Sequence, residues 1–270
     1  MKVPEVYNID RNVHASNYDA LPADQLLVTS IFPTLQGEGP FAGEPAVFLR
    51  LAGCNFGGKG VNGPGCTFCD TYFEYGKGQP RTFSDIYEAL NRAMLSFRKT
   101  WKLIQKNSQQ LVVITGGEPT LQNNLTDFIR KAPDVFTFQI ETNGARTIDV
   151  AGAYVVWSPK AAETLLNGGW VLGAASPRQI EWSNCLKMLI SANPESPYFD
   201  VPHWVFDYRK PIWLSPICVY KAKPTYPTNA WLDDCIDREE TSKNYMRAAQ
   251  LALRYGFRLS TQQHLFLGLE

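Results

Sequence analysis

The sequence lacks a long apolar segment, an excess of charge and any repeated or low-complexity tract. No apolar run approaches the roughly 18–20 residues that a membrane-spanning helix requires, so no transmembrane segment is expected. The 26 Lys and Arg residues equal the 26 Asp and Glu residues, which argues against a broad surface for nucleic acid or for an anionic membrane. The N-terminus has no basic and then apolar signal pattern. We therefore expect a cytoplasmic protein without nucleic-acid or membrane partners.

Cysteine is scarce, with six residues in the chain. Thiols stay reduced in the cytosol, so these cysteines are expected to be metal ligands, catalytic groups or buried thiols rather than disulfides. Cys185, Cys218 and Cys235 are scattered along the sequence, and buried thiols are common in protein cores. The remaining three lie in one stretch, which makes that stretch the candidate for chemistry.

Eleven residues separate Cys54 from Cys66, and two separate Cys66 from Cys69. A structural zinc site closes with four ligands, whereas three thiolates would leave one iron of a four-iron cluster open to a further ligand. S-adenosylmethionine (SAM) has an amine and a carboxylate suited to that iron, and one electron from the cluster would release a carbon radical from it. The alternative is a zinc site completed by a distant residue such as Cys235 or His264.

The chain is long enough for two domains, but α/β barrels of roughly 200–250 residues are routinely single domains. Its hydrophobic fraction of 44% is enough for a sizeable core. We expect residues 1–24 to form an N-terminal extension and residues 25–270 to form a single core domain.

Alternating strand and helix patterns predict an α/β fold. Apolar, β-rich runs predict strands at 26–32, 46–51, 111–115, 135–140, 154–157, 185–190, 211–219 and 257–260. Apolar residues at three- to four-residue spacing, with capping signals, predict helices at 84–106, 120–131 and 239–255. Polar residues follow the strands, as in a βα barrel or an open parallel sheet whose site lies beyond the C-terminal strand ends. Residues 161–184 show no clear pattern.

Several of the polar groups that follow strands suit ligand binding. Gly116 and Gly117 allow the backbone to approach a ligand closely, and Glu118 after them suits an ammonium group. A tight βα turn explains these three residues equally well. Glu141 and Asn143 suit ribose hydroxyls, or they cap the strand through an Asx-type turn.

Other residues suit a heterocyclic substrate that carries a carboxylate. Gln36 and Glu38 offer the mixture of donors and acceptors that a pterin or purine edge requires. Arg50 suits bidentate pairing with a carboxylate, although a structural salt bridge is the alternative. The Thr71 hydroxyl suits Mg²⁺. His264 is interpreted as a core histidine rather than a ligand or base.

Taken together, these segments resemble the 7-carboxy-7-deazaguanine synthases, a family of radical SAM enzymes. The segments that carry the resemblance are 33–39, 43–50, 53–71, 115–119, 141–144, 158–160 and 262–268, so it spans about residues 26–270. The resemblance implies an α/β fold, a modified and incomplete (βα) barrel, in a homodimer. It implies a lyase that contracts 6-carboxy-5,6,7,8-tetrahydropterin to 7-carboxy-7-deazaguanine with loss of ammonia, in queuosine and other 7-deazapurine biosynthesis. It also implies a 4Fe-4S cluster, SAM and Mg²⁺, with a one-electron donor such as flavodoxin or ferredoxin.

The resemblance assigns site residues but no catalytic side chain beyond the SAM-derived radical. The implied iron–sulfur ligands are Cys54, Cys66 and Cys69, and the implied magnesium contact is Thr71. The implied SAM contacts are Phe68, Cys69, Asp70, Gly117, Glu118, Glu141, Ser158, Pro159, Lys160, Ser215, Pro216, Ile217 and Cys218. The implied pterin contacts are Leu35, Gln36, Gly37, Arg50, Thr115 and Glu270. The chain departs from the pattern in its eleven-residue cysteine spacing, where three is usual, and in having Ser215-Pro216 where many relatives have Gln-Pro.

Two other functions fit parts of the sequence. A glycyl-radical activase also combines three cysteines with SAM, but it acts on a protein partner and gives no role to Arg50 or to the Gln36 loop. A zinc-bearing structural or binding protein is the second alternative. Anaerobic protein with about four irons per chain would be brown, whereas a zinc protein would be colourless.

Overall fold

The structure is a computed structural model. It describes residues 21–55, 57–58, 61–64, 66, 68–69, 78–101, 109–150, 152–164, 169–172, 176–221 and 235–267. The chain divides into two compact units, one of Met1–Gln36 with Glu44–Tyr154 and one of Gly37–Gly43 with Val155–Glu270. The single core domain over 25–270 and the extension over 1–24 stay predictions. Among the described residues, no helix is long and apolar enough to cross a membrane.

The first unit is built on a mixed sheet. Its strands lie in the order β5 (Gln79–Thr82), β1 (Gln25–Leu35), β2 (Pro45–Leu51), β6 (Gln110–Gly116) and β7 (Phe136–Thr142). Strands β2, β6 and β7 are parallel, as the sequence pattern predicts, whereas β1 is antiparallel to both β2 and β5. Parallel neighbours need a crossover of a dozen or more residues. The loop from β1 to β2 is shorter than that, so it reverses the chain.

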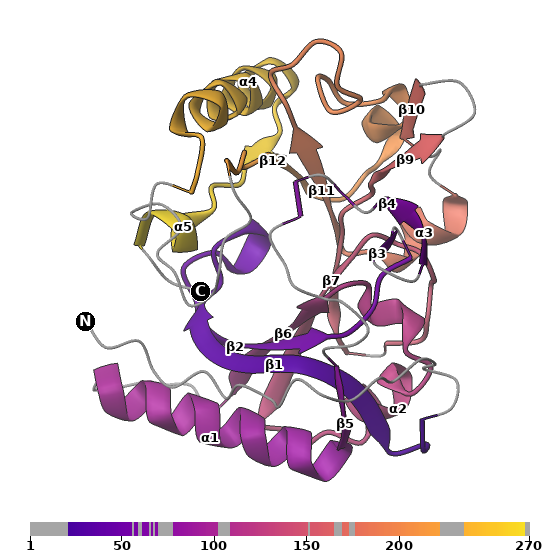
Figure 1. The fold of residues 1–270 in the computed structure, drawn as a ribbon, viewed down its shortest axis with the longest axis vertical. Helices are drawn as coiled ribbons and strands as arrows, with labels where there is room; N and C mark the ends of the chain where they lie inside the picture. The colour runs from indigo at the N-terminus through magenta and orange to yellow at the C-terminus, as the bar shows by residue number, and fades with distance from the viewer. Residues whose placement is uncertain are drawn as a thin grey trace. The chain divides into compact units, whose positions relative to one another are not determined.

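Helix α1 (Phe83–Trp101) covers one face of this sheet along β1 and β2 (Figure 1). Its apolar stripe of Ile86, Leu90 and Met94 is completely buried. The Thr82 hydroxyl accepts a hydrogen bond from the Asp85 backbone N–H at 3.2 Å and donates to the Asp85 carboxylate, which confirms the predicted cap. The predicted helix over 84–106 is therefore confirmed up to Trp101, and residues 102–108 lie outside the described residues.

The helix predicted over 120–131 begins later than the sequence pattern indicates. Pro119–Leu121 forms a 3₁₀ turn (η4), and helix α2 runs only over Leu125–Arg130. The Glu118 side chain caps the 3₁₀ turn by accepting from the Thr120 backbone N–H at 3.0 Å. This local cap ends the first turn before an α-helix is established.

The second unit contains the parallel strands β8 (Tyr154–Trp157), β11 (Cys185–Ile190), β12 (Ile212–Pro216) and β13 (Arg258–Leu259), in that order. Helix α4 (Arg238–Tyr255) packs on β11 and β12 through Ala248, Leu251 and Ala252. It begins after the N-cap Asp237 and ends at Gly256, whose φ of 71° is left-handed. The predicted helix over 239–255 is thus confirmed.

Short elements complete both units. Antiparallel pairs join β3 (Gly57–Gly58) to β4 (Val61–Pro64) and β9 (Ala161–Thr164) to β10 (Gly169–Leu172). The others are η2 (Gly39–Phe41), α3 (Pro177–Trp182), η5 (His203–Asp207) and α5 (Gln263–Leu267). The hairpin β9–β10 and helix α3 occupy the part of the sequence that shows no clear pattern.

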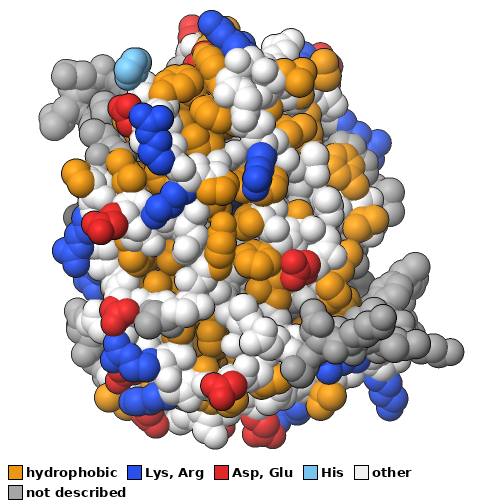
Figure 2. All heavy atoms as spheres, turned by 180° about the vertical axis from the view of Figure 1, so that it is seen from behind, with side chains coloured by type: hydrophobic (Ala, Val, Ile, Leu, Met, Phe, Trp, Pro, Cys, Tyr) orange, Lys and Arg blue, Asp and Glu red, His pale blue; other side chains and the backbone are white. Residues whose placement is uncertain are grey.

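The surface agrees with the balanced charge of the sequence. On the face shown in Figure 2, basic and acidic side chains lie interspersed among apolar and neutral ones. The described residues on this face therefore form no broad surface of one sign.

Candidate functional site

The end of β6 lies against the chain that leads into the cysteine-rich loop. The Gly117 N–H donates to the Leu51 carbonyl oxygen at 3.0 Å, and the Glu118 N–H donates to the Gly53 carbonyl oxygen at 2.7 Å. A Cβ atom at Gly117 would lie 1.9 Å from that Gly53 oxygen. Only glycine permits this approach, so the Gly-Gly-Glu-Pro turn and the residue before Cys54 are held together by backbone contact.

Glu118 joins the ends of β6 and β7. Its side chain is 1% exposed, and one carboxylate oxygen accepts from the Thr120 N–H, the Thr120 hydroxyl and the Thr142 hydroxyl. The other oxygen accepts from the Asn143 N–H at 2.6 Å. Burial raises the pKa of Glu118, while these hydrogen bonds oppose the rise. The residue therefore stabilises the strand ends, and its role toward an ammonium group stays a prediction.

Asn143 connects β7 to the same loop. Its side-chain N–H donates to the Asn55 side-chain oxygen at 2.8 Å, directly after Cys54. Its own side-chain oxygen accepts from the Ala145 N–H at 2.9 Å. This second bond is the predicted Asx-type turn. The C-terminal ends of β2, β6 and β7 thus meet around Cys54 and Asn55.

The face of β2, β6 and β7 that carries Arg50 also carries Thr115 and Glu141. Arg50 is paired in register with Thr115, and the β6–β7 register reaches Ile114 opposite Ile140, one residue before Thr115 and Glu141. The Arg50 guanidinium lies over the Phe32 ring at 4.7 Å. The sheet therefore brings together a cation, a hydroxyl and a carboxylate that the sequence predicts at the site.

Gln139 was not predicted as a site residue, but it supports Glu141. Its side chain is completely buried, and its amide N–H donates to the Glu141 carboxylate at 2.6 Å. Its side-chain oxygen has no hydrogen-bond partner among the described residues. A Gln two residues before a functional carboxylate on the same strand face is the signal that would have identified it.

The three cysteines differ in their surroundings. Cys54 is buried at the end of β2, whereas Cys66 and Cys69 are half-buried. The Cys69 N–H donates to the Cys66 carbonyl oxygen at 3.0 Å, so these two thiols belong to one turn. In the part of the chain that the structure describes, no group of three His, Cys, Asp or Glu side chains is arranged to hold a metal ion. Ligation by all three cysteines stays a prediction. Phe68 is half-buried, and Asp70 and Thr71 lie outside the described residues.

Within the second unit, the segment after β8 folds on itself. The Lys160 ammonium donates to the Ser158 carbonyl oxygen and to the Ser158 hydroxyl, both at 2.7 Å. Ser158 and Pro159 are buried and Lys160 is half-buried. The predicted SAM contacts of this segment are therefore held in one compact turn.

The predicted contacts from Ser215 to Cys218 lie at the end of β12 and directly after it, and they are buried. The Ile217 N–H donates to the Ile190 carbonyl oxygen at 2.9 Å, which continues the pairing with β11. The Asn244 side chain of α4 donates to the Ile217 carbonyl oxygen at 2.7 Å. Helix α4 thus fixes the backbone of this segment.

The predicted pterin segment Leu35–Gly37 is held by contacts with other parts of the chain. Leu35 ends β1, and the Gln36 N–H donates to the Glu44 carbonyl oxygen at 2.8 Å. In the second unit, the His264 ring lies so close to Gly37 that a Cβ there would be 2.0 Å from its Nδ1 atom. A side chain at position 37 would therefore have to displace the His264 ring, and the interpretation of His264 as a core histidine stays a prediction. Glu270 lies outside the described residues.

Glu38 belongs to a buried network of charged and polar groups in this unit. Its carboxylate accepts from the Lys187 ammonium at 2.6 Å and from the Ser215 hydroxyl at 3.2 Å. Burial raises its pKa, but Lys187, the nearby His264 and these hydrogen bonds outweigh burial and lower the pKa of Glu38 to about 2. Lys187 was not predicted as a site residue, although a lysine inside the apolar strand Cys185–Ile190 is an unusual feature that could have identified it.

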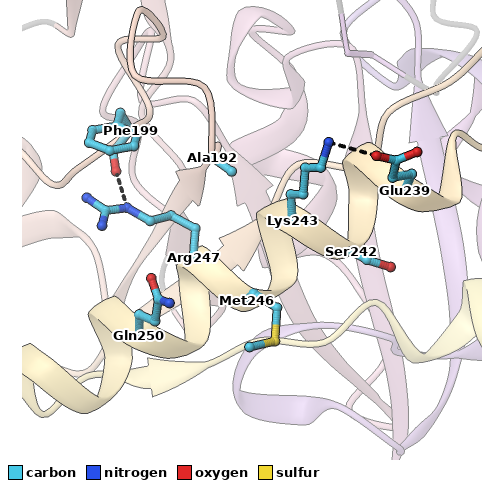
Figure 3. A pocket seen from close by; sticks show the side chains of 8 residues that line it. All are labelled: Ala192, Phe199, Glu239, Ser242, Lys243, Met246, Arg247 and Gln250. Carbon is cyan, nitrogen blue, oxygen red and sulfur yellow. Dashed lines mark hydrogen bonds and ion pairs between the residues drawn. The ribbon is translucent and has the colours of Figure 1, made fainter.

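A separate groove of about 720 Å³ lies along α4. Figure 3 shows that its charged groups are engaged, with Arg247 donating to the Phe199 carbonyl oxygen and Lys243 paired with Glu239. None of the residues that line it belongs to the predicted site. The groove is therefore a surface feature beside α4 and not the candidate site.

Comparison with known proteins finds relatives that match most of the chain. The chain is 34% identical over 251 residues to the 7-carboxy-7-deazaguanine synthase of Rickettsia prowazekii, which covers 91% of this chain and 89% of the relative. The chain belongs to the 7-carboxy-7-deazaguanine synthase family. The family member of Rhodospirillum rubrum is 30% identical over 255 residues and covers 90% of this chain and 92% of its own length. No protein-family model matches the chain.

The crystal structure of QueE from Escherichia coli has the same fold. It aligns with a TM-score of 0.51 at 23% sequence identity and covers 93% of this chain and 100% of that one. The predicted fold, a modified and incomplete (βα) barrel of the radical SAM type, is confirmed. Membership of this radical SAM family implies SAM and an iron–sulfur cluster as cofactors, and the three thiols and the glycine turn beside Cys54 fit them chemically.

Proposed function

We propose that the chain is a ring-contracting lyase that converts 6-carboxy-5,6,7,8-tetrahydropterin to 7-carboxy-7-deazaguanine with loss of ammonia. The product would serve queuosine and other 7-deazapurines. The observation that carries the proposal is the meeting of the β2, β6 and β7 ends around Cys54 and Asn55 in a member of this family. Radical SAM chemistry requires a cluster and its ligand at such a strand-end site.

The cysteine-rich loop would hold the 4Fe-4S cluster through Cys54, Cys66 and Cys69. SAM, when bound beside this cluster, would supply the carbon radical needed for hydrogen abstraction from the pterin. The residues that would bind and orient SAM are Phe68, Cys69, Asp70, Gly117, Glu118, Glu141, Ser158, Pro159, Lys160, Ser215, Pro216, Ile217 and Cys218.

The pterin would be held by Leu35, Gln36, Gly37, Arg50, Thr115 and Glu270. Arg50 would pair with the substrate carboxylate, because a guanidinium presents two parallel donors to the two carboxylate oxygens. Its stacking over Phe32 supports this role by fixing the plane of the guanidinium. Thr71 would contact Mg²⁺, which prefers oxygen ligands and would steady the substrate carboxylate.

The enzyme would act in the cytoplasm as a homodimer. A one-electron donor such as flavodoxin or ferredoxin would reduce the cluster before each cleavage. The balanced charge of the chain supports a small-molecule substrate rather than nucleic acid.

Anaerobic turnover tests the proposal. The reconstituted protein is mixed with the pterin, SAM and a chemical reductant, and the product is identified by mass spectrometry. We expect 7-carboxy-7-deazaguanine and ammonia in equal amounts. Cleavage of SAM without that product would contradict the lyase, and a glycyl radical formed on a large protein partner would favour an activase. Colourless protein with one zinc per chain would favour a structural zinc site.

A further inference from the structure

A buried ion pair in the second unit has no place in the function described so far. The Lys187 ammonium of β11 lies 2.6 Å from the Glu38 carboxylate, and the two side chains are only 9% and 17% exposed. Removing two charges from water is costly, and an apolar pair of similar volume is often as stable. An ion pair at this position therefore calls for a role beyond stability.

The Glu38 carboxylate is held from several elements at once. Lys187 contacts one carboxylate oxygen, and the Ser215 hydroxyl of β12 donates to the other at 3.2 Å. His264 of α5 contributes a nearby charge, and Tyr245 of α4 is close enough for Glu38 to raise its pKa. These contacts fix the plane and the charge of the carboxylate.

The backbone on either side of Glu38 is fixed as well. The Gly37 carbonyl oxygen accepts from the Gln263 N–H at 3.1 Å, and the Gly39 N–H donates to the Ser260 hydroxyl at 3.0 Å. Both anchors come from the C-terminal segment of the chain. The carboxylate thus cannot turn away without breaking contacts in the loop and in the side-chain network.

The position of Glu38 indicates what the held carboxylate is for. It directly follows Leu35–Gly37, the segment proposed to bind the pterin, and part of the side chain remains accessible. The amino-pyrimidinone edge of a pterin presents two parallel N–H donors, which match the two oxygens of a carboxylate. A carboxylate oxygen can accept more than one hydrogen bond.

We propose that Lys187 is a positioning residue for substrate recognition, which holds the Glu38 carboxylate ionised and oriented as the acceptor for the amino-pyrimidinone edge of the pterin. This inference rests on the proposed function. Lys187 acts only through Glu38 and has no contact with the reacting carbon. The wild-type recognition is insensitive to pH in the neutral range, because the pKa of Glu38 is about 2.

The test compares Lys187→Met with the wild-type holoenzyme. We expect the KM for the pterin, and its equilibrium dissociation constant measured without reductant, to rise about tenfold to a hundredfold. The KM for SAM should stay within about twofold. The KM for the pterin should also rise further as pH falls from 8 to 6, because loss of the cation leaves burial to raise the pKa of Glu38.

The matched control is Lys210→Met. Lys210 lies in the same unit, and its ammonium donates to the Ile180, Glu181 and Ser183 carbonyl oxygens at the end of α3, at 2.5–3.0 Å. Its loss should lower stability and leave both KM values and their pH profiles unchanged. Equal effects of the two lysine substitutions on pterin binding would overturn the proposal.

A double variant separates recognition from folding. Lys187→Met with Glu38→Gln removes both charges, so no uncompensated charge remains buried if Lys187→Met alone fails to fold. We expect weak pterin binding with a flat pH profile. Wild-type affinity in either variant would overturn the proposal while leaving the lyase intact, whereas a wild-type protein that neither binds nor converts the pterin would overturn both.

Discussion

Gly117→Ala tests the contact that joins the β6 turn to the chain before Cys54. A Cβ at this position would lie 1.9 Å from the Gly53 carbonyl oxygen and 2.4 Å from its carbon, both backbone atoms that cannot rotate aside. The ends of β2 and β6 must therefore separate, which would break the 2.7 Å bond from the Glu118 N–H to the same oxygen. Forcing an extra methyl group into packed structure costs about 1–3 kcal/mol, and losing a buried hydrogen bond adds about 1 kcal/mol.

The expected loss of unfolding free energy is thus about 2–4 kcal/mol. Urea unfolding of the anaerobic holoenzyme measures this free energy. The iron content of the variant should be lower than that of the wild type, because Cys54 directly follows the displaced Gly53 carbonyl. Gly152→Ala is the matched control, since Gly152 has a left-handed φ of 84° but no atom within 4 Å of an added Cβ. It should lose only about 1–2 kcal/mol from backbone strain and no iron. If Gly117→Ala is as stable as Gly152→Ala and retains its iron, the close-contact reasoning is wrong.

Three further predictions follow from individual contacts. Tyr87→Phe removes a hydroxyl that donates to a backbone carbonyl of α2 and should lower the free energy of unfolding by about 1 kcal/mol in urea titrations. Gln139→Leu should loosen Glu141 and thereby raise the KM for SAM, with little loss of stability. Gln110→Leu is the control, because Gln110 is also a buried amide whose side-chain oxygen has no partner among the described residues, and it should leave that KM unchanged. Equal KM values for the two variants would contradict the support of Glu141 by Gln139. Because the folded pKa of Glu38 is about 2 against 4.5 for an ordinary glutamate, ionisation of Glu38 beside Lys187, His264 and Ser215 stabilises the folded state fully above pH 4.5 and progressively less as pH falls toward 2, by about 3 kcal/mol in all. Urea midpoints of Glu38→Gln should lack this acid-dependent fall, and an identical fall would refute it.

Much of the fold could be predicted because hydrophobic periodicity is local. The run Leu111–Ile114 is buried on both faces and carries no polar residue, so it reads as a central parallel strand. The apolar stripe and the N-terminal cap of helix α1 can likewise be recognised from the spacing of its residues in the sequence. The antiparallel direction of β1 was missed because it depends on loop length rather than on the strand itself.

Candidate site residues can be named from the sequence where a residue type has an intrinsic chemical property. Thiolates bind metals and glycine permits close backbone approach, so the cysteines and the paired glycines could be chosen as candidates, and their roles stay predictions. Lys187 was not predicted because its partner, Glu38, is remote in sequence. Gln139 was not predicted because its contact with Glu141 depends on the two side chains lying on the same face of β7. His264 shows the same limit, since its contact with Gly37 spans most of the chain and only the tertiary structure reveals it.

The proposed function depends on Cys54, Cys66 and Cys69 holding a cluster with one open iron beside the ends of β2, β6 and β7. Electron paramagnetic resonance of the anaerobic, dithionite-reduced protein, recorded with and without SAM, measures this property. We expect about four irons per chain and a cluster signal that changes on addition of SAM, with Cys54→Ala, Cys66→Ala and Cys69→Ala each losing the cluster. A single zinc per chain, or a cluster signal that SAM leaves unchanged, would show that the three cysteines do not form this site.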